Sequence, residues 1–361
     1  MKLQDFIIRI RIAILIVGAL AIYGCNVIGP QAISGGRGVY AEVINRTADE
    51  EILNVIVRMR YDETFDMISV ASVTANLRFS ARVGTNIGMG NSNDYAGNLV
   101  PLSVGVAYEE NPTISYVPLS GEDFMRRMFS PVSLSEWFLV SSHAKHPDQV
   151  FDLAVRSING LKNSLLEQKS SPDFARFFKL YGLLRRADML NVIFRVGQGY
   201  FLEFNKYKDK HDDSVREILE LLGIELKSDG STITLPILVG SGSSADAIIL
   251  ELRSAYEVLQ LFGGGIEIPP AHIESGIVES LTWSMSEERR FIAIRSSEKD
   301  WLNSRPENAS VAIRFHDRWF YIDATDIHSK QAFVWLRTFI GMRLADPSTT
   351  HKAPVITIPV N

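Results

Sequence analysis

The stretch NLRFSARV, residues 76–83, alternates apolar and polar side chains, and the stretch VPLSVGVAY, residues 100–108, does the same. A Gly- and Asn-rich segment, residues 84–98, lies between them. Alternation with a period of two is typical of strands with one buried face, because successive side chains point to opposite faces of a sheet. Together these segments predict a long β-hairpin with a Gly- and Asn-rich tip.

Helical and strand-like patterns continue on both sides of this hairpin. Thr47 and Glu50 form a capping-box pattern, which predicts the start of a helix, and Asn111-Pro112 predicts a turn after the second strand. We expect helices at about residues 47–60, 120–130, 148–166, 173–184, 214–222, 243–262 and 326–344, and further strands at about residues 113–117, 192–196, 232–239, 311–315, 319–323 and 354–360. Helices mixed with antiparallel hairpins in this way predict the α+β class.

The chain is long enough for more than one domain, at 361 residues. A polar segment in which a proline follows two serines, residues 166–173, separates two runs of helix and strand patterns. We therefore predict an N-terminal α+β domain over residues 38–168, which contains the long hairpin, and a C-terminal α+β domain over residues 169–361.

The N-terminal segment has the pattern of a signal peptide. Lys2, Arg9 and Arg11 give the start of the chain a positive charge, and the segment that follows, IAILIVGALAIY, has no charge. Gly24 and Cys25 come directly after it, and Cys25 is the only cysteine in the chain. A basic start, an apolar segment and a small residue before a cleavage point are the three parts of a signal peptide.

This segment resembles the N-terminus of a bacterial lipoprotein precursor. Ile22 and Gly24 occupy the aliphatic and small positions of the lipoprotein pattern, whereas Tyr23 departs from it. The resemblance implies that a lipoprotein signal peptide, residues 1–24, is cleaved between Gly24 and Cys25. It also implies that the Cys25 thiol carries a diacylglyceryl group and that the new amino group is acylated, which would anchor the chain in membrane lipid.

The residues after the cysteine indicate where such a lipoprotein is sorted. Small residues and glycines without a pattern predict a lipidated tether over residues 25–37. Asn26, rather than Asp, follows the cysteine, and this resembles lipoproteins that reach the outer membrane and face the periplasm. The alternative is an uncleaved anchor in the inner membrane, because no charge occurs between Ile12 and Arg37.

Segments along the whole chain resemble a family of Gram-negative bacterial lipoproteins of uncharacterised function. These segments are residues 44–47 with 58–61, residues 111–116 with 118–119, residues 318–323 and residues 353–360. The resemblance implies a location in the cell envelope. It implies no catalytic residue, cofactor or substrate.

Composition narrows the class of protein further. Hydrophobic residues make up 46% and charged residues 22% of the chain, which is typical of a folded protein rather than a disordered or multispan membrane protein. The single cysteine excludes a disulfide framework and a cysteine-based metal cluster. A net charge of −5 and the lack of a basic stripe argue against nucleic acid as a partner.

One loop has the composition of a ligand-binding segment. Gly240, Ser241, Gly242, Ser243 and Ser244 follow a predicted strand and precede a predicted helix, a layout in which backbone amides can bind a phosphate. The loop lacks the lysine of a P-loop and the residue order of a nucleophile elbow. A flexible turn with a helix N-cap explains the same residues, so we predict no catalytic residue, no metal and no cofactor.

Other chemical motifs are weaker. They are the S-x-x-K pattern of residues 142–145, the pair His143 and His146, the segment His211-Asp212-Asp213, and a polar set around the last hairpin, His316, Asp323, Asp326 and His328. We interpret the pair His143 and His146 and the His211 segment as solvated surface. Asp326 is interpreted as a helix cap and His316 as a turn residue. The aromatic residues 319–321 are expected to pack in the core and across strands.

These observations favour a lipid-anchored, periplasm-facing outer-membrane protein that acts as a binding or assembly component with an envelope protein partner. Whether it forms a homo-oligomer is left open. One alternative is an envelope hydrolase with a site near residues 241–244 or around His316 and Asp323. The other is a ring-forming pore subunit that uses the strands within residues 68–117. Arg78 and Arg82 fit a soluble sheet with one face in water equally well.

Overall fold

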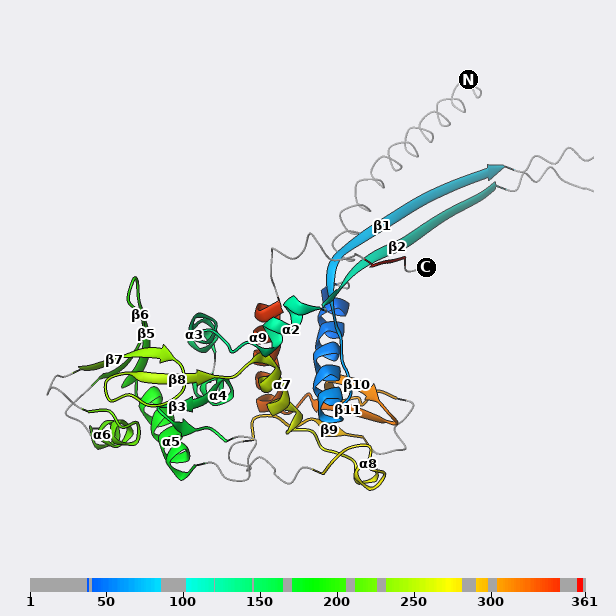
Figure 1. Ribbon diagram of the computed structural model, residues 1–361. Helices are drawn as coiled ribbons and strands as arrows, with labels where there is room; N and C mark the ends of the chain where they lie inside the picture. Colours follow the sequence, from blue (N-terminus) through cyan, green and yellow to red (C-terminus); the bar gives the residue numbers. More distant parts are fainter. Residues whose placement is uncertain are drawn as a thin grey trace, which may run out of the picture.

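The computed structural model describes residues 38, 41–85, 102–119, 121–144, 146–164, 171–205, 212–225, 232–280, 290–297, 304–344 and 356–359. Within these residues the chain forms three β-sheets and a set of helices, which confirms the α+β class (Figure 1). The predicted signal peptide, Cys25 and the tether lie outside the described residues.

A long two-stranded arm is the most extended part of the structure. Strands β1 (Met67–Thr85) and β2 (Leu102–Leu119) pair antiparallel, from Met67 opposite Leu119 to Thr85 opposite Leu102. The arm projects away from the rest of the molecule, which we call the body (Figure 1). The short strand β12 (Ile356–Pro359) pairs with β2 near the base of the arm. The predicted pairing of the two hairpin strands and the C-terminal strand are confirmed, whereas the Gly- and Asn-rich tip beyond Thr85 lies outside the described residues.

The predicted turn at Asn111-Pro112 is wrong, and so is a separate third strand after it. Asn111 pairs with Asn76 and Pro112 pairs with Ala75, so β2 continues through both residues. Proline has no N–H group to donate and is therefore tolerated where a strand lies at the edge of a sheet. The pairing of β12 with β2 ends at Thr113, which leaves Pro112 at such an edge within the described sheet.

The first helix of the body covers residues 41–60 and therefore begins earlier than Thr47. Leu53, Ile56 and Val57 on this helix are fully buried. Thr47 lies in the middle of the helix, and its hydroxyl donates to the carbonyls of the preceding turn at 3.0 and 3.1 Å. The predicted capping box is wrong because the backbone is already helical before Thr47, and a threonine inside a helix bonds back to the turn before it.

A six-stranded sheet occupies one end of the body (Figure 1). In spatial order its strands are β4 (Leu161–Lys162), β3 (Val155–Ile158), β8 (Ile248–Leu252), β7 (Thr232–Val239), β6 (Gly199–Asn205) and β5 (Leu190–Arg195). β7 and β8 are parallel, and the other neighbours are antiparallel. Helices α5 (Pro172–Arg186) and α6 (Asp212–Leu221) contact each other beside this sheet, and Phe174 and Phe177 of α5 are fully buried.

The predicted helix at 148–166 is wrong in its second half. Helix α4 (Pro147–Ala154) ends where β3 begins, and β3 and β4 form a short hairpin. Asn159 and Gly160 connect the two strands, with φ angles of 44° and 81°. An Asn-Gly pair in this left-handed conformation is a strong hairpin signal, and it overrides the helical spacing of the surrounding apolar residues.

The predicted helix at 243–262 is wrong in its first half. Residues 248–252 form β8, and helix α7 (Ala255–Gly263) begins only after Ser254. Ser254 and Glu257 form the capping box that fixes this start. The apolar side chains Ile248, Leu250 and Leu252 alternate along a buried strand, although the wider spacing also fits one side of a helix.

The remaining helices and a smaller sheet complete the body. The helices are α2 (Glu122–Phe129), α3 (Leu134–His143), α8 (Pro270–Glu274) and α9 (Ile327–Leu344). The sheet has three strands, in the spatial order β10 (Ala309–Phe315), β11 (Arg318–Asp323) and β9 (Arg295–Ser296). The predicted last hairpin and the helix after Asp326 are confirmed. Helix α3 was not expected, although Ser133 and Glu136 form a capping box at its start.

One hydrophobic core runs through the body, from Ile52 to Ile340. The six-stranded sheet combines β3 and β4 with four strands that come later in the chain. The predicted boundary between residues 168 and 169 falls in the segment 165–170, outside the described residues. The division into two domains therefore stays a prediction.

Candidate functional site

An apolar cavity of about 450 Å³ lies between α3, α4 and α9. The lining residues on one side come from the end of α3 and from α4, and those on the other side come from α9. They are His143, Ala144, His146, Gln149, Val150 and Leu153, and Ile327, Lys330, Gln331, Ala332, Val334 and Trp335. Sites for small molecules usually have volumes of about 300 to 1,000 Å³ and mostly apolar walls with a few polar groups. This cavity, which we call the α9 cavity, is the best candidate for a ligand site among the described residues.

Trp335 forms a rigid wall of the α9 cavity. Its ring stacks against Phe339 with a centroid distance of 5.3 Å and lies parallel to Phe262 at 6.5 Å. The indole N–H is buried and has no hydrogen-bond acceptor among the described residues. Because a buried donor without an acceptor raises the free energy of the folded state, an acceptor carried by a ligand would remove that cost if it reached this group.

The structure brings His143 and His146 to the α9 cavity, together with Lys330. Nδ1 of His143 hydrogen-bonds the carbonyl of Leu139 at 2.8 Å, so this nitrogen carries the proton in the neutral ring. The Lys330 ammonium donates to the carbonyl of Ala324 at 3.0 Å. The described part of the chain contains no group of three or more His, Cys, Asp or Glu side chains arranged to hold a metal ion.

The loop of Gly240, Ser241, Gly242, Ser243 and Ser244 connects the parallel strands β7 and β8 and does not precede a helix. The predicted strand before it is confirmed, but the amide cradle needs the N-terminus of a helix, which is absent at this position. The Ser244 hydroxyl donates to the Asp246 carboxylate at 2.8 Å. This local turn explains the hydroxyl without a ligand.

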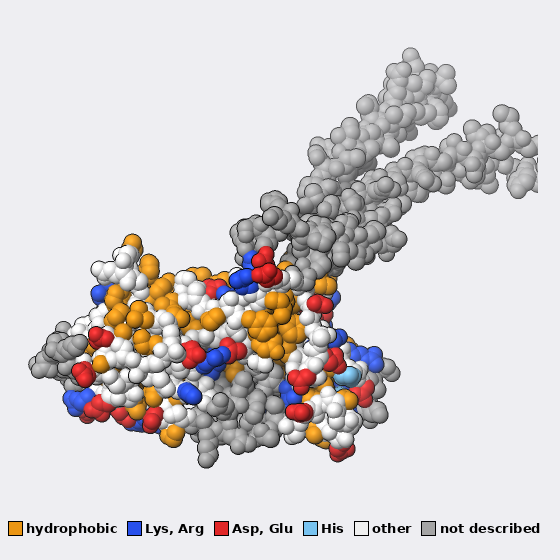
Figure 2. Space-filling model, in the orientation of Figure 1, with side chains coloured by type: hydrophobic (Ala, Val, Ile, Leu, Met, Phe, Trp, Pro, Cys, Tyr) orange, Lys and Arg blue, Asp and Glu red, His pale blue; other side chains and the backbone are white. Residues whose placement is uncertain are grey.

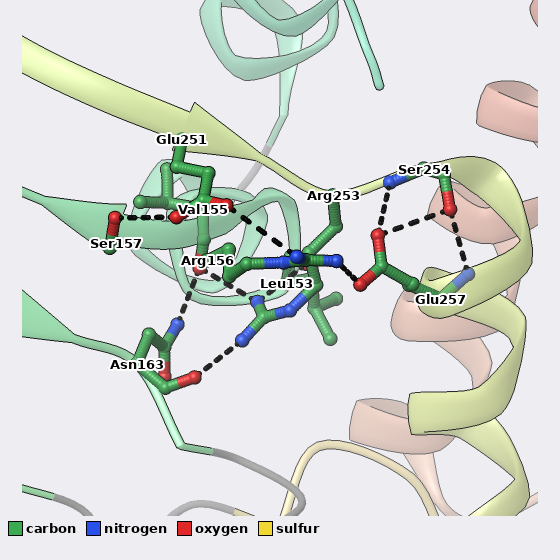
Figure 3. Close-up of polar contacts among 9 residues, drawn as sticks. All are labelled: Leu153, Val155, Arg156, Ser157, Asn163, Glu251, Arg253, Ser254 and Glu257. Atoms are coloured by element: carbon green, nitrogen blue, oxygen red, sulfur yellow. Dashed lines mark hydrogen bonds and ion pairs between the residues drawn. The ribbon is translucent and has the colours of Figure 1, made fainter. Parts of the chain in front are cut away.

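The most extensive buried polar cluster surrounds Arg253 (Figure 3). Its guanidinium points to the end of α4 and donates to the carbonyls of Asp152, Leu153 and Val155 at 2.7 to 3.0 Å. It also donates to the carbonyl of Asn163 at 2.6 Å. The end of a helix leaves carbonyls unpaired and carries partial negative charge, so a buried cation is stabilised there. Arg253 therefore connects the helix to the strand that follows it.

Charged side chains surround this cluster at the surface (Figure 3). Arg156 pairs with Glu257, which also accepts from the backbone N–H of Ser254 at 2.9 Å. Glu251 accepts from the hydroxyl of Ser157 at 3.0 Å. These groups satisfy one another, and the arrangement is that of a structural junction rather than a reactive site.

A second chain of hydrogen bonds links the buried Tyr61 and His272 to the half-exposed Asp317. The Tyr61 hydroxyl lies 2.7 Å from Nδ1 of His272, and Nε2 of His272 lies 2.9 Å from Oδ1 of Asp317. Burial raises the pKa of Tyr61 to about 12. The hydrogen bond from His272 lowers the pKa of Asp317. Tyr61 follows the first helix, His272 lies on α8, and Asp317 lies in the turn between β10 and β11, so this chain connects three parts of the body.

The other candidate residues have structural roles where the structure describes them. Asp326 accepts from the Ser329 backbone N–H at 3.1 Å and so caps α9. His316 lies in the turn between β10 and β11 with a φ of 50°, and Asp323, at the far end of β11, accepts from Thr325. His328 is exposed in the first turn of α9. The structure does not bring these four residues together into one site.

The S-x-x-K pattern and the His211 segment lie only partly within the described residues. The hydroxyl of Ser142 donates to the carbonyl of Phe138 at 2.7 Å, and Lys145 lies outside the described residues. His211 lies outside them as well, and Asp213 pairs with Arg216 at 3.2 Å on the surface.

A larger cavity, of about 750 Å³, lies at the base of the arm between the first helix and α9. The Glu51 carboxylate in its wall accepts a hydrogen bond from the backbone N–H of Ile68. Burial raises the pKa of Glu51, and this hydrogen bond lowers it to a smaller extent. The contact fixes the first residues of the arm to the body, which gives Glu51 a structural role.

No family model, curated protein or solved structure matches the chain. Among the helices that the structure describes, none is long and apolar enough to cross a membrane.

Proposed function

We propose that this chain is a lipoprotein anchored through Cys25 to the outer membrane, facing the periplasm, and that it assembles with an envelope protein through its β1–β2 arm. The arm is the observation that carries the assembly role, because it extends far from the body (Figure 1). At about 3.3 Å per residue, a strand of this length spans roughly 60 Å. A tethered body with such a projection can contact a partner at a distance from its own anchor.

The backbone of the arm is suited to pairing with another chain. Among the described strands, β1 pairs only with β2, and β12 covers β2 only from Thr113 to Tyr116. An unpaired strand edge is a template for an added strand, in which main-chain hydrogen bonds give affinity. The outer part of the arm, residues 75–85 and 102–112, therefore has two edges available within the described chain.

The surface near the base of the arm supports the same role. On the face drawn in Figure 2, hydrophobic side chains gather on the body close to the arm. Helix α2 lies in this region, and its Met125 and Phe129 side chains are 48% and 50% exposed (Figure 1). Exposed apolar side chains next to a free strand edge are typical of a protein–protein contact.

A ring-forming pore subunit is the second candidate, and the length of the outer arm favours it. Residues 75–85 and 102–112 form a purely two-stranded segment with eleven residues in each strand. A tilted strand that crosses a bilayer needs about 9 to 11 residues. An envelope hydrolase gains no such support, because the Ser244 loop forms a local turn.

The anchor is tested by the intact mass of the detergent-extracted protein, wild type beside Cys25→Ser. We expect the wild-type mass to show the loss of residues 1–24 and the gain of acyl chains, and the variant to show neither. A full-length, unmodified wild-type chain would contradict the lipid anchor and the sorting argument from Asn26.

The arm is tested by photo-crosslinking in intact cells. A photoreactive amino acid replaces Ser80 on β1 or, as the matched control, Val196, which is 90% exposed in the turn between β5 and β6. We expect a discrete crosslinked product from position 80 and none from position 196. Equal crosslinking from both positions would contradict an assembly role for the arm.

The pore candidate is separated from assembly by dye release from liposomes. The comparison uses the wild-type chain and a variant in which Asn-Gly replaces residues 77–110. Release by the wild type and not by the variant supports the pore. A crosslink from position 80 without dye release supports assembly alone.

A further inference from the structure

The α9 cavity has apolar walls and a polar rim. Val150, Leu153, Ala332 and Trp335 contribute apolar surface. Most of these side chains belong to the continuous core, so the walls are held in place by packing on their far sides. A cavity with such fixed walls accepts an apolar group without a large rearrangement of the protein.

The polar groups at the rim share one character. They belong to His143, His146, Gln149, Gln331 and Lys330, whose ammonium is held by the carbonyl of Ala324. The lysine carries a positive charge, the two amides have N–H donors, and none of the described lining residues is Asp or Glu. This charge distribution is complementary to an anion and unfavourable for a cation.

Apolar side chains also remain in water at the cavity. Ile327 and Val334 of α9 are 61% and 63% exposed, although both line it. A ligand with an apolar chain would cover part of this surface, and each buried methylene contributes roughly 0.8 kcal/mol.

We propose that the α9 cavity binds a fatty acid, with the acyl chain against Leu153, Ala332 and Trp335 and the carboxylate at the rim beside Lys330 and the two histidines. The apolar walls select a chain, and the cationic rim without carboxylates selects a negatively charged head. This site lies on the body and does not depend on lipidation of Cys25 or on the arm.

The test uses the full chain in vesicles of phosphatidylcholine, a zwitterionic lipid, and a dodecanoic acid that carries a diazirine on its chain. After irradiation, digestion and mass spectrometry locate the labelled residues. We expect labels in residues 143–153 and 327–335, suppressed by excess dodecanoate but not by dodecanol. Labels that avoid both segments, or equal competition by dodecanol, would overturn the proposal.

Two matched substitutions place a carboxylate inside and outside the site. Ile327→Asp adds negative charge at the cavity, and an acidic residue in the first turn of α9 is compatible with the helix dipole, so the fold is retained. Val196→Asp adds the same charge at a 90% exposed position away from the lining residues. We expect labelling to fall about tenfold in Ile327→Asp and to remain unchanged in Val196→Asp.

A third variant tests the cation. Lys330→Gln keeps a hydrogen-bond donor but removes the positive charge, so we expect weaker labelling by the acid probe and no change for a diazirine-labelled dodecanol. Thermal unfolding of all variants provides the folding control. Unchanged labelling in both Ile327→Asp and Lys330→Gln, with folding intact, would overturn the carboxylate site.

Discussion

Arg253 determines how the end of α4 is connected to the six-stranded sheet. It is only 5% exposed, and its guanidinium donates to four backbone carbonyls. Arg253→Met keeps most of the side-chain volume but removes every one of these donors. Because buried carbonyls that lose a charged donor are costly, we expect the free energy of unfolding to fall by about 3 kcal/mol or more, as measured by urea denaturation of the detergent-extracted protein.

Arg195→Met is the matched surface control. Arg195 lies over the ring of Phe201 and 3.7 Å from the Glu203 carboxylate, and its side chain is 45% exposed. Exposed pairs of this kind contribute about 0 to 1 kcal/mol. An equally small loss in both variants would show that the carbonyls around Arg253 find other donors.

The Tyr61–His272–Asp317 chain predicts a specific dependence of stability on pH. The hydrogen bond from His272 lowers the pKa of folded Asp317 below its ordinary value of 3.8. A lowered pKa stabilises the fold above the ordinary value, and this contribution is lost as the pH falls through the folded pKa. We therefore expect Asp317→Asn to be less stable than wild type at neutral pH, with a difference that shrinks as the pH falls below 3.8.

Tyr61→Phe distinguishes this titration from a simple loss of contact. It removes the other hydrogen bond of His272, and the Tyr61 hydroxyl, with its pKa of about 12, stays protonated throughout the acid range. The loss of stability in Tyr61→Phe, measured by the urea midpoint, should not shrink as the pH falls below 3.8. A pH-independent difference between Asp317→Asn and wild type would contradict the assigned role of Asp317.

For single residues, contacts between neighbours in the sequence could be predicted, whereas contacts between residues far apart in the sequence could not. The predicted cap at Asp326 is confirmed, and its partner Ser329 is only three residues away. Tyr61 and His272 are 211 residues apart, and no spacing rule connects them. The α9 cavity shows the same limit: the sequence pattern favours solvated surface for His143 and His146, and no spacing connects them with α9, which supplies the opposite wall.

Two capping-box patterns with different outcomes give a prediction at the scale of the helix. Ser254 is 4% exposed, and its hydroxyl accepts from the backbone N–H of Glu257 at 3.2 Å, whereas Thr47 lies inside its helix. We expect Ser254→Ala to lower the free energy of unfolding by about 1 kcal/mol. Thr47→Ala should change it by less than about 0.5 kcal/mol, because alanine favours a helix interior.

Urea denaturation of the two variants side by side is the measurement. A loss of similar size in Thr47→Ala would mean that the helix begins at Thr47, as the sequence pattern alone suggests. A neutral Ser254→Ala would mean that α7 begins without its cap.

Most elements could be predicted from periodicity, and the errors have two physical causes. The first is a turn signal that outweighs the helical spacing of the apolar residues around it. At Asn159-Gly160 a left-handed turn connects two strands, although the surrounding apolar residues also fit a helix. The second is tertiary pairing, as at Ile248, which pairs with Ile237 of β7 and therefore belongs to a strand. A short run of apolar residues fits both the helical period of 3.6 residues and the strand period of two. Pairing with a neighbouring strand then determines which of the two structures forms.

At the scale of the whole molecule, the α+β class follows from the sequence, but the six-stranded order does not. β3 and β8 are adjacent although about ninety residues separate them, and β7 lies parallel to β8. Such crossovers depend on how the strands pack together, which a reading of local patterns does not capture. The arm, by contrast, is a hairpin of consecutive strands, and its pairing follows the chain.

The separation of arm and body predicts that the arm can be shortened without loss of stability. In a variant in which Asn-Gly replaces residues 77–110, Asn76 and Asn111 remain opposite each other, and the pairing of β12 with β2 is kept. The described backbone that is removed pairs with itself and lies away from the body (Figure 1). We therefore expect the unfolding temperature to stay within about 3 °C of the wild type.

Shortening another hairpin is the matched control for this prediction. Replacing residues 194–200 with Asn-Gly keeps Ile193 opposite Phe201 but removes Tyr200, whose ring contacts Phe138 of α3 at 5.2 Å. Because this hairpin packs against the body, we expect the control to unfold at a clearly lower temperature. If shortening the arm lowers the unfolding temperature as much as the control does, the arm is part of the folding unit. If only the control is affected, the long arm adds nothing to the stability of the body, which supports a role for its length in contacts beyond the body.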